Sequence, residues 1–217
     1  MPSRGNLAAV PPPRAAATAA TRRAILDAAE ELLASIGEAG LSIREVCGRA
    51  GVTAPTVYHH FGDKRALVDC VVAECFTRFD RNFRRRDVPG DPVERLRWSF
   101  DRYVAYGLAH PDHYRLMFQQ PAPRPTAAGR ASYARLERLV QAVAEAGRLV
   151  PPVAAATAAF WAAVHGVTAL LVSGCLRPAT PAAALVRDAM IAQLTRPAPP
   201  APARRARRRR PPGRSTA

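Results

Sequence analysis

Apolar residues recur along most of this chain at intervals of three and four positions, with polar residues between them. This is the period of an amphipathic helix. The first such stripe follows Thr21 and consists of Ile25, Ala28, Ala29, Leu32, Leu33 and Ile36. No alternating strand pattern and no glycine-rich phosphate loop occurs in the sequence. The pattern therefore predicts an all-α protein whose first helix begins near Thr21.

A second, short helix is predicted after two glycines break the first stripe. Ser42 and Glu45 form a capping box, in which the serine side chain satisfies a free backbone N–H at the helix N-terminus. Gly51 is expected to end this helix, because glycine adopts the left-handed conformation of a helix C-terminus at little cost. The helix should therefore extend from Ser42 to about Ala50.

A third helix is predicted directly after this turn. Thr53 is a suitable N-cap, and Pro55 falls in the first turn, where its missing N–H removes no hydrogen bond. Val57 and Phe61 are four residues apart and are predicted to face inward. The other side chains form an outward face suited to base edges and phosphates, namely Thr53, Ala54, Pro55, Thr56, Tyr58 and His59.

Residues 21–67 resemble the DNA-binding domain of the TetR (tetracycline-repressor-like) family of transcriptional regulators. The matching motifs are R-x-x-I-L-x-A-A-x-x-L at 22–32, S-x-R-E-V at 42–46, A-G-V-T at 50–53, and T-V-Y-H-H-F with D-K-x-x-L at 56–67. The resemblance implies that the second helix of the helix-turn-helix enters the major groove of double-stranded DNA. It implies groove-facing positions at Arg44, Ala54, Pro55, Thr56 and Tyr58. It implies phosphate contacts at Thr21, Ser42, His59 and Lys64.

The individual DNA contacts differ in how well the sequence supports them. Ala54 is small and apolar, so it can at most touch a thymine methyl group. Tyr58 and His59 have an alternative interpretation as ordinary surface residues. Lys64 is more informative, because a cation in the first turn after Asp63 opposes the helix dipole and has no evident stabilising role. Binding of a phosphate explains its position.

From Lys64 onward the chain predicts further helices with short breaks. A broad apolar stripe from Leu67 to Phe83 lies on one long helix, and Pro92 opens the next. A short helical piece follows at 110–118, and further helices are expected at about 127–147, 152–175 and 181–195. The expected fold is an N-terminal three-helix helix-turn-helix domain joined by a long helix to an antiparallel helical ligand-binding and dimerisation domain.

The second half resembles a TetR-family C-terminal domain marked by a Trp-x-x-x-His-Gly signature. Here that signature is Trp161, His165 and Gly166. The resemblance implies that Trp161 and His165 line an effector pocket, with Tyr103, Tyr106, Met117, Phe118 and Phe160 as neighbours. The alternative, which we favour for His165, is a satisfied core histidine beside a buried tryptophan. Because acids are few in this half, the expected effector is a small apolar or aromatic molecule, neutral or weakly anionic, and not a cationic drug.

The last two predicted helices suggest a homodimer. A single helix-turn-helix contacts only half of a palindromic site, so a two-fold dimer is expected. Small residues allow these helices to pack closely in a four-helix interface with a second copy. They are Ala158, Ala162, Ala169, Gly174, Ala182, Ala183, Ala184 and Ala189.

The charge distribution leaves a second function class open. Of the formal net charge of +15, eight positive charges lie after Thr195 and two lie in the first twenty residues, which leaves +5 for the remainder. Residues 21–65 hold six bases and six acids and are neutral overall. DNA affinity must therefore come from placed contacts, dimerisation and the tails. A sequence-specific, ligand-responsive repressor is the main hypothesis, and a non-specific architectural DNA-binding protein aided by the arginine-rich tail is the alternative.

The remaining expectations concern boundaries and exclusions. We expect a disordered N-terminal arm at 1–20, a DNA-binding domain at 21–67, an effector and dimerisation domain at 68–195, and a disordered tail at 196–217. No nucleophile, base and orienting group occur together, so no enzymatic activity is expected. No cofactor or metal is expected, because the five histidines form no ligand cluster with the four cysteines. With neither a bilayer-spanning stretch nor a signal peptide predicted, we expect a cytoplasmic protein that does not contact a membrane.

Overall fold

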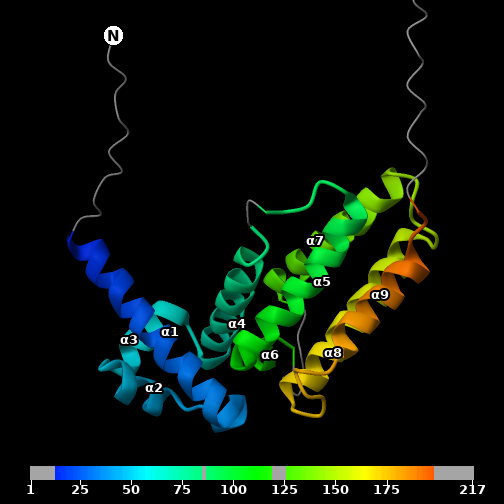
Figure 1. Ribbon diagram of the computed structural model, residues 1–217. Coiled ribbons are helices and arrows are strands. Elements are labelled where there is room, and N and C mark those ends of the chain that lie inside the picture. Colours follow the sequence, from blue (N-terminus) through cyan, green and yellow to red (C-terminus); the bar gives the residue numbers. More distant parts are fainter. Residues whose placement is uncertain (1–12, 85–86, 119–125, 198–217) are drawn as a thin grey trace, which may run out of the picture.

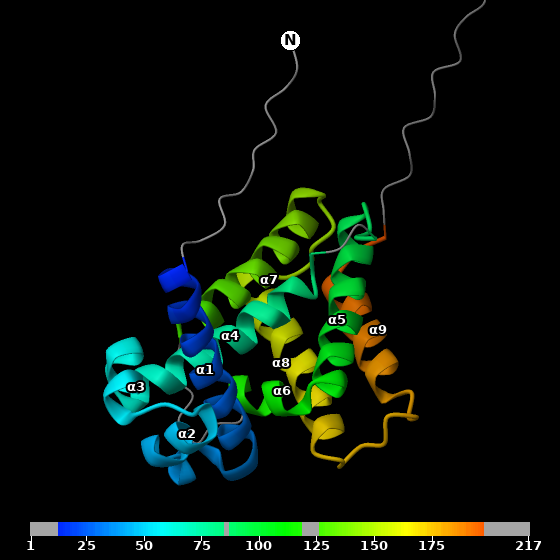
Figure 2. The same ribbon diagram turned by 90° about the vertical axis from the view of Figure 1, so that its left-hand side faces the viewer.

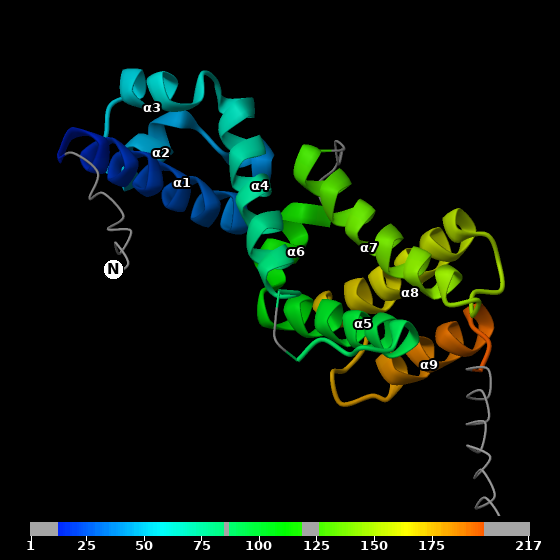
Figure 3. The same ribbon diagram turned by 90° about the horizontal axis from the view of Figure 1, so that it is seen from above.

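The computed structural model describes residues 13–197 apart from 85–86 and 119–125. Within these residues the fold is all-α, with nine helices and, outside them, a single β-bridge between Leu149 and Thr195. The three N-terminal helices form one unit, and α4 connects it to the remaining helices (Figure 1). Seen from above, α3 lies at one end of the molecule and α8 and α9 lie at the other (Figure 3).

The N-terminal unit consists of α1 (Pro13–Gly40), α2 (Ile43–Ala50) and α3 (Ala54–Phe61). The apolar stripe predicted for α1 is buried except for Ile36, which is exposed. The predicted start of α1 was wrong, because residues 13–20 are helical and not part of a disordered arm. Alanine has the highest helix propensity, so this alanine-rich segment forms a helix although residues 15–20 stay exposed and bury nothing.

The helix ends in this unit follow the predicted local chemistry, with one exception. The Ser42 hydroxyl accepts from the Glu45 backbone N–H at 3.2 Å and donates to the Glu45 carboxylate at 2.7 Å. Gly51 ends α2 in the left-handed conformation, with φ of 65°. Thr53 is the N-cap residue of α3, but its hydroxyl pairs with that of Thr56 at 3.0 Å instead of a backbone N–H.

The second unit begins on α4 (Lys64–Arg81), which ends before Phe83, the last residue of the apolar stripe expected on this helix. It continues with α5 (Pro92–Ala109), α6 (Pro111–Phe118), α7 (Ala127–Glu145), α8 (Val153–Val172) and α9 (Ala182–Leu194). The predicted helix at 152–175 is three residues shorter at its C-terminus. Gly174 has φ of 77°, and this left-handed residue stops the helix and leaves Cys175 exposed. The view in Figure 2 shows α1 crossing in front of α4.

Helix α8 corrects one expectation. It is long and apolar enough to cross a membrane by length and composition, with a mean hydropathy of 1.6 over its best window. The sequence predicts no bilayer-spanning stretch, yet this helix holds no charged residue. It packs against α5, α7 and α9, and its buried side chains belong to the core of the second unit. Within that window 39% is buried inside the chain, so packing against the other helices accounts for part of its apolar character.

Candidate functional site

The outward face of α3 is the first candidate site. Val57 and Phe61 are buried and anchor α3 to the core, as predicted. Tyr58 is 49% exposed, although it is a large aromatic residue on a short helix. Pro55 and His59 are exposed, and Ala54 and Thr56 are half-buried on the same helix. An exposed tyrosine ring beside small and polar side chains leaves this face available to a nucleic acid.

The predicted phosphate contacts outside α3 belong to three other helices, with Thr21 inside α1, Ser42 at the N-cap of α2 and Lys64 at the start of α4. Thr21 is half-buried on α1, and its hydroxyl donates to the Ala17 carbonyl at 3.0 Å. The Ser42 hydroxyl is occupied by the capping box of α2, because it donates its hydrogen to Glu45, so Ser42 can donate to a phosphate only through its backbone N–H. Lys64 lies in the first turn of α4, directly after Asp63, whose carboxylate accepts from the Ala66 N–H at 2.7 Å.

The cations of this unit fall into two groups. Arg23 pairs with Asp27 at 2.5 Å, and Arg49 pairs with Glu31 at 3.1 Å, so both are committed within the chain. Lys64 and Arg44 form no ion pair with any described residue. This distinction could not be made from the sequence, because it depends on which helices meet. Arg22 and Arg65 likewise form no ion pair with a described residue, so the two predicted contact residues are among the available cations of this unit.

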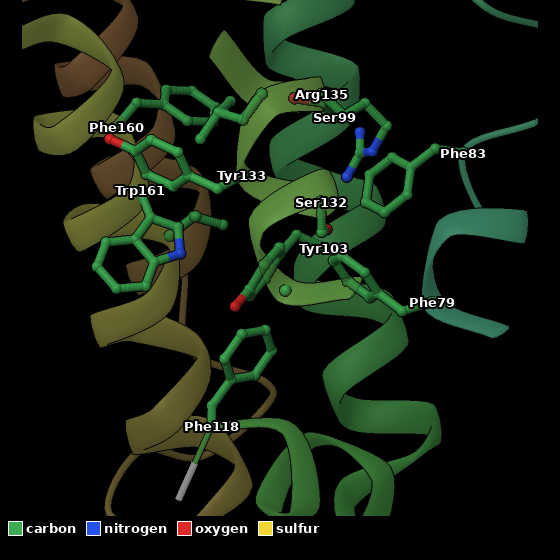
Figure 4. Close-up of a pocket in the computed structure, with 13 residues that line it drawn as sticks. Phe79, Phe83, Ser99, Tyr103, Phe118, Ser132, Tyr133, Arg135, Phe160 and Trp161 are labelled. Carbon is green, nitrogen blue, oxygen red and sulfur yellow. The ribbon is translucent and has the colours of Figure 1, made fainter. Parts of the chain in front are cut away.

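A pocket between α4, α5, α6, α7 and α8 is the second candidate site (Figure 4). Its cavity volume is about 80 Å³. Four of the seven predicted pocket residues line it, namely Tyr103, Phe118, Phe160 and Trp161. The other lining residues are Phe79, Phe83, Ser99, Gly129, Ser132, Tyr133, Arg135, Leu136 and Val164. Three predicted residues, Tyr106, Met117 and His165, do not line this pocket.

His165 lies behind the pocket in a hydrogen-bonded cluster. Its Nδ1 is 3.0 Å from the Tyr103 hydroxyl and 3.1 Å from the Tyr114 hydroxyl, and the latter also donates to the His165 carbonyl. Burial lowers the pKa of His165, so the imidazole is neutral at pH 7. Trp161 stacks on it with ring centroids 5.3 Å apart. The geometry matches the satisfied histidine that we favoured, although its neighbour Trp161 is 39% exposed and not buried.

The polar side of the pocket was missed by the sequence analysis. Arg135 lies over the Phe83 ring at 3.7 Å from its centroid, and its Nε is 3.3 Å from Asp80. Ser132 donates to the same Asp80 carboxylate at 3.1 Å. Ser132 and Arg135 lie on α7 and Asp80 lies on α4, and no motif links the two segments in sequence. Phe79 and Phe83 were assigned to an apolar stripe, which does not distinguish a core residue from a cavity wall.

A polar network connects the two units of the chain. Glu30 of α1 accepts from Arg78 of α4 at 2.6 Å and lies 2.8 Å from Nε2 of His113 on α6. The other nitrogen of His113 is 3.1 Å from the Tyr106 hydroxyl, so Tyr106 belongs to this network and does not line the pocket. Burial acts to raise the pKa of Glu30, but hydrogen bonds from His113 and Arg78 outweigh it and lower the pKa to about 2. Glu30 is therefore a charged, half-buried junction between the units.

This network also corrects the expectation that no histidine clusters with a cysteine. Donor atoms of Glu30, Cys75 and His113 lie within 4.8 Å of one another, a spacing compatible with metal ligands. Burial, however, raises the pKa of the Cys75 thiol to about 12. The Arg78 guanidinium contacts both Glu30 and His113 Nε2, the latter at 3.2 Å. The Arg78 guanidinium therefore already contacts two of the three groups that would bind a metal ion. The cluster fits an ion-pair network better than a metal site.

An exposed face on the second helix of a helix-turn-helix, together with a pocket in a separate helical unit, is typical of two-domain helix-turn-helix regulators. Residues 25–71 match the family model of bacterial regulatory proteins of the tetR family. Residues 96–194 match the model of the tetracyclin repressor-like C-terminal domain. The chain therefore belongs to the TetR family of bacterial regulatory proteins.

Individual relatives agree with this assignment. The HTH-type transcriptional repressor Rv3405c of Mycobacterium tuberculosis is 36% identical over 85 residues, which are 39% of this chain and 45% of that protein. The chain spans less than half the length of the curated relatives it matches. A structure of a protein of unknown function from Rhodococcus sp. RHA1 has 27% identity and a TM-score of 0.70, covering 81% of this chain and 96% of the other. The structure of RolR in complex with the ligand resorcinol has a TM-score of 0.60 at 20% identity, covering 83% and 90% of the two chains, and shares the fold.

Proposed function

We propose that this protein is a ligand-responsive repressor that binds a palindromic operator as a homodimer. The observation that carries the proposal is the exposed face of α3 around Tyr58, flanked by Lys64 with no acid paired to it among the described residues. In a helix-turn-helix the second helix lies in the major groove and the flanking helix ends contact phosphates. Arg44, Ala54, Pro55, Thr56 and Tyr58 are the proposed groove contacts. Thr21, Ser42, His59 and Lys64 are the proposed phosphate contacts.

The dimer is proposed to form through α8 and α9. Leu185 is 64% exposed on α9, and Leu170 is exposed on α8. Ala162 and Ala189 are also exposed on these helices. Exposed leucines beside alanines on two adjacent helices suit the close packing of a four-helix interface. A two-fold dimer would present two copies of α3 to the two halves of a palindrome.

The effector is proposed to occupy the pocket lined by Tyr103, Phe118, Phe160 and Trp161. Aromatic walls with a few polar groups are typical of small-molecule sites and suit an apolar or aromatic compound. RolR, which shares the fold, binds the one-ring aromatic resorcinol, and this supports the same ligand size here. We place His165 behind this site, where its bond to Tyr103 fixes the orientation of a pocket wall.

The effect of the ligand on DNA binding is proposed to pass through α4 and α6. Phe79 and Phe118 line the pocket, and the same two helices carry Arg78 and His113, which contact Glu30 of the DNA-binding unit. A ligand that favours one position of α6 over another would shift the population of DNA-competent dimers. The proposed role is regulatory, without catalysis, a cofactor or a membrane partner, and it places the protein in the cytoplasm with the DNA.

The test of this function compares two contact variants with wild type. Tyr58→Phe and Lys64→Ala should each weaken operator binding, while thermal unfolding stays nearly unchanged because neither side chain contributes to the core. Lys64→Ala should act on all DNA sequences and reduce the salt slope of binding by about one. Fluorescence anisotropy with operator and random duplexes measures both effects.

Arg177→Ala removes an exposed cation beyond α8 and serves as the matched control, which should keep wild-type affinity. Wild-type affinity in both contact variants would contradict the proposed docking.

A further inference from the structure

The pocket contains one feature that an apolar effector leaves unexplained, which is the cation Arg135 in its wall. We propose that the effector is a one-ring aromatic carboxylate whose carboxyl group binds Arg135. This inference rests on the proposed effector role of the pocket and names the ligand class. Its support is the placement of Arg135, the local charge, the hydrogen-bonding groups and the cavity size.

Arg135 is held in place by aromatic rings and not by a strong ion pair. Its guanidinium lies 3.7 Å from the centroid of Phe83 and 5.9 Å from that of Phe79. Stacking on aromatic faces fixes the plane of a guanidinium and leaves its edge free for hydrogen bonds. The Nε edge contacts Asp80 at 3.3 Å, and the terminal nitrogens form no hydrogen bond with any described residue. An arginine in this state presents a fork of donors that matches a carboxylate.

The local charge favours an anion. Burial lowers the pKa of Arg135, and the neighbouring cation Arg138 lowers it further, while Asp80 opposes both. The Asp80 carboxylate also accepts a hydrogen bond from the Ser132 hydroxyl at 3.1 Å, so it interacts with Ser132 as well as with Arg135. Arg135 lines the pocket and Asp80 does not, so the charged group that a ligand meets in this wall is a cation. A ligand carboxylate would complement this cation, whereas a ligand cation would be repelled by it.

The uncommitted hydrogen-bonding groups of the pocket are mainly donors. The Tyr103 hydroxyl pairs with His165, and the Ser99 hydroxyl donates to the Leu96 carbonyl. The indole N–H of Trp161 and the terminal N–H groups of Arg135 have no acceptor among the described residues. Figure 4 shows the indole nitrogen of Trp161 on the side of the ring that faces the other labelled residues. A ligand that complements these groups carries acceptors, as a carboxylate does.

The cavity is small, so even a one-ring ligand requires its walls to move. Its volume of about 80 Å³ is smaller than the ~150 Å³ cavity that holds benzene in an engineered protein core. Tyr133 and Trp161 form an edge-to-face pair with centroids 5.9 Å apart and are more than a third exposed. These two rings border the pocket at the solvent-facing side and can separate to admit a ring. A fused or multi-ring compound would need a much larger displacement.

The test is a titration of the full-length protein with four compounds, without DNA, by calorimetry and tryptophan fluorescence. The compounds are benzoate, its neutral analogue benzamide, its cationic analogue benzamidine, and acetate, which has the charge without the ring. We expect benzoate to bind at least about tenfold more tightly than the other three, as a hydrogen-bonded charge pair predicts. Trp98→Phe leaves Trp161 as the sole tryptophan and should retain the fluorescence change.

Variants then assign the selectivity to Arg135. Arg135→Gln should weaken benzoate at least about tenfold and leave benzamide within about twofold. Arg138→Gln, on the same helix but exposed, is the control and should change benzoate less than about threefold. Asp80→Asn removes the competing carboxylate and should tighten the binding of benzoate, which provides a test if the arginine variant fails to fold.

Equal binding of benzoate and benzamide, or no benzoate binding below about 1 mM, would overturn the inference. Operator binding is measured separately, so its loss would contradict the proposed function and not this ligand class.

Discussion

At the scale of single residues, Glu30 joins the two units of the molecule. Its carboxylate contacts Arg78 at 2.6 Å and His113 at 2.8 Å, and its side chain is only 17% exposed. A carboxylate whose pKa is lower in the folded than in the unfolded state stabilises the fold above its unfolded pKa. This stabilisation is lost as the pH falls from the ordinary value of 4.5 toward the folded value of about 2.

Glu30→Gln should therefore lower the free energy of unfolding at pH 7 by about 2 kcal/mol, after allowance for the solvent that reaches the side chain. The difference from wild type should disappear as the pH falls from about 4.5 to about 2. Urea unfolding at a series of pH values measures it. Glu31→Gln breaks only an exposed ion pair with Arg49 and is the control, expected within about 0.5 kcal/mol of wild type. An equal loss in both variants would show that the junction has no special role.

At the scale of helices, the crossing of α5 and α8 depends on Gly107. A Cβ at this position would lie 2.4 Å from Cγ2 of Thr168, which is fully buried. Gly107→Ala should destabilise the protein by about 1–3 kcal/mol, because overpacking forces the two helices apart. Thr168→Ser removes the opposing methyl group and keeps the hydroxyl, which donates to the Val164 carbonyl. The cost of Gly107→Ala should be smaller in that background.

The control for this pair lies on α8 itself. A Cβ on Gly166 would meet no described atom within 4 Å, so Gly166→Ala should not destabilise the chain and should gain up to about 1 kcal/mol of helix propensity. Thermal unfolding of the single and double variants measures these differences. A neutral Gly107→Ala would mean that the two helices are not held at this distance.

The elements also show what the sequence could and could not predict. Local chemistry specified the ends of α2, because a capping box and a left-handed glycine act within a few residues. Periodicity identified α1 but placed its start too late, since it detects burial and the exposed alanines of residues 15–20 bury nothing. The aromatic walls Tyr103 and Phe160 were expected, whereas Arg135 was not. Its role depends on α7 meeting α4, and contacts between distant helices leave no periodic signal in one sequence.

At the scale of the whole molecule, the proposed dimer makes a direct prediction. Leu185→Arg places a charge on the exposed face of α9 and should give monomers with weak operator binding, because an unpaired charge in an interface is costly. Ile36→Arg changes an equally apolar exposed residue on α1, far along the chain from α8 and α9, and should stay dimeric. Analytical ultracentrifugation at micromolar concentration measures both. A monomeric wild type, or a dimeric Leu185→Arg, would argue against this interface.

The charge of the molecule decides which measurement tests the account most directly. Residues 21–65 are neutral overall, while the sequence after Thr195 carries eight arginines. Specific binding must therefore come from placed contacts of α3, whereas binding through the arginines would be independent of sequence. The two contributions differ in their dependence on DNA sequence and on salt.

The decisive measurement is fluorescence anisotropy of the full-length protein on two duplexes of equal length over a series of salt concentrations. One duplex carries the palindrome found directly upstream of the protein's own gene, and the other has a random sequence. The account predicts binding to the palindrome at least about a thousandfold tighter, with the preference retained as salt is raised. Equal affinity for both duplexes at every salt concentration would contradict it and support a non-specific architectural protein.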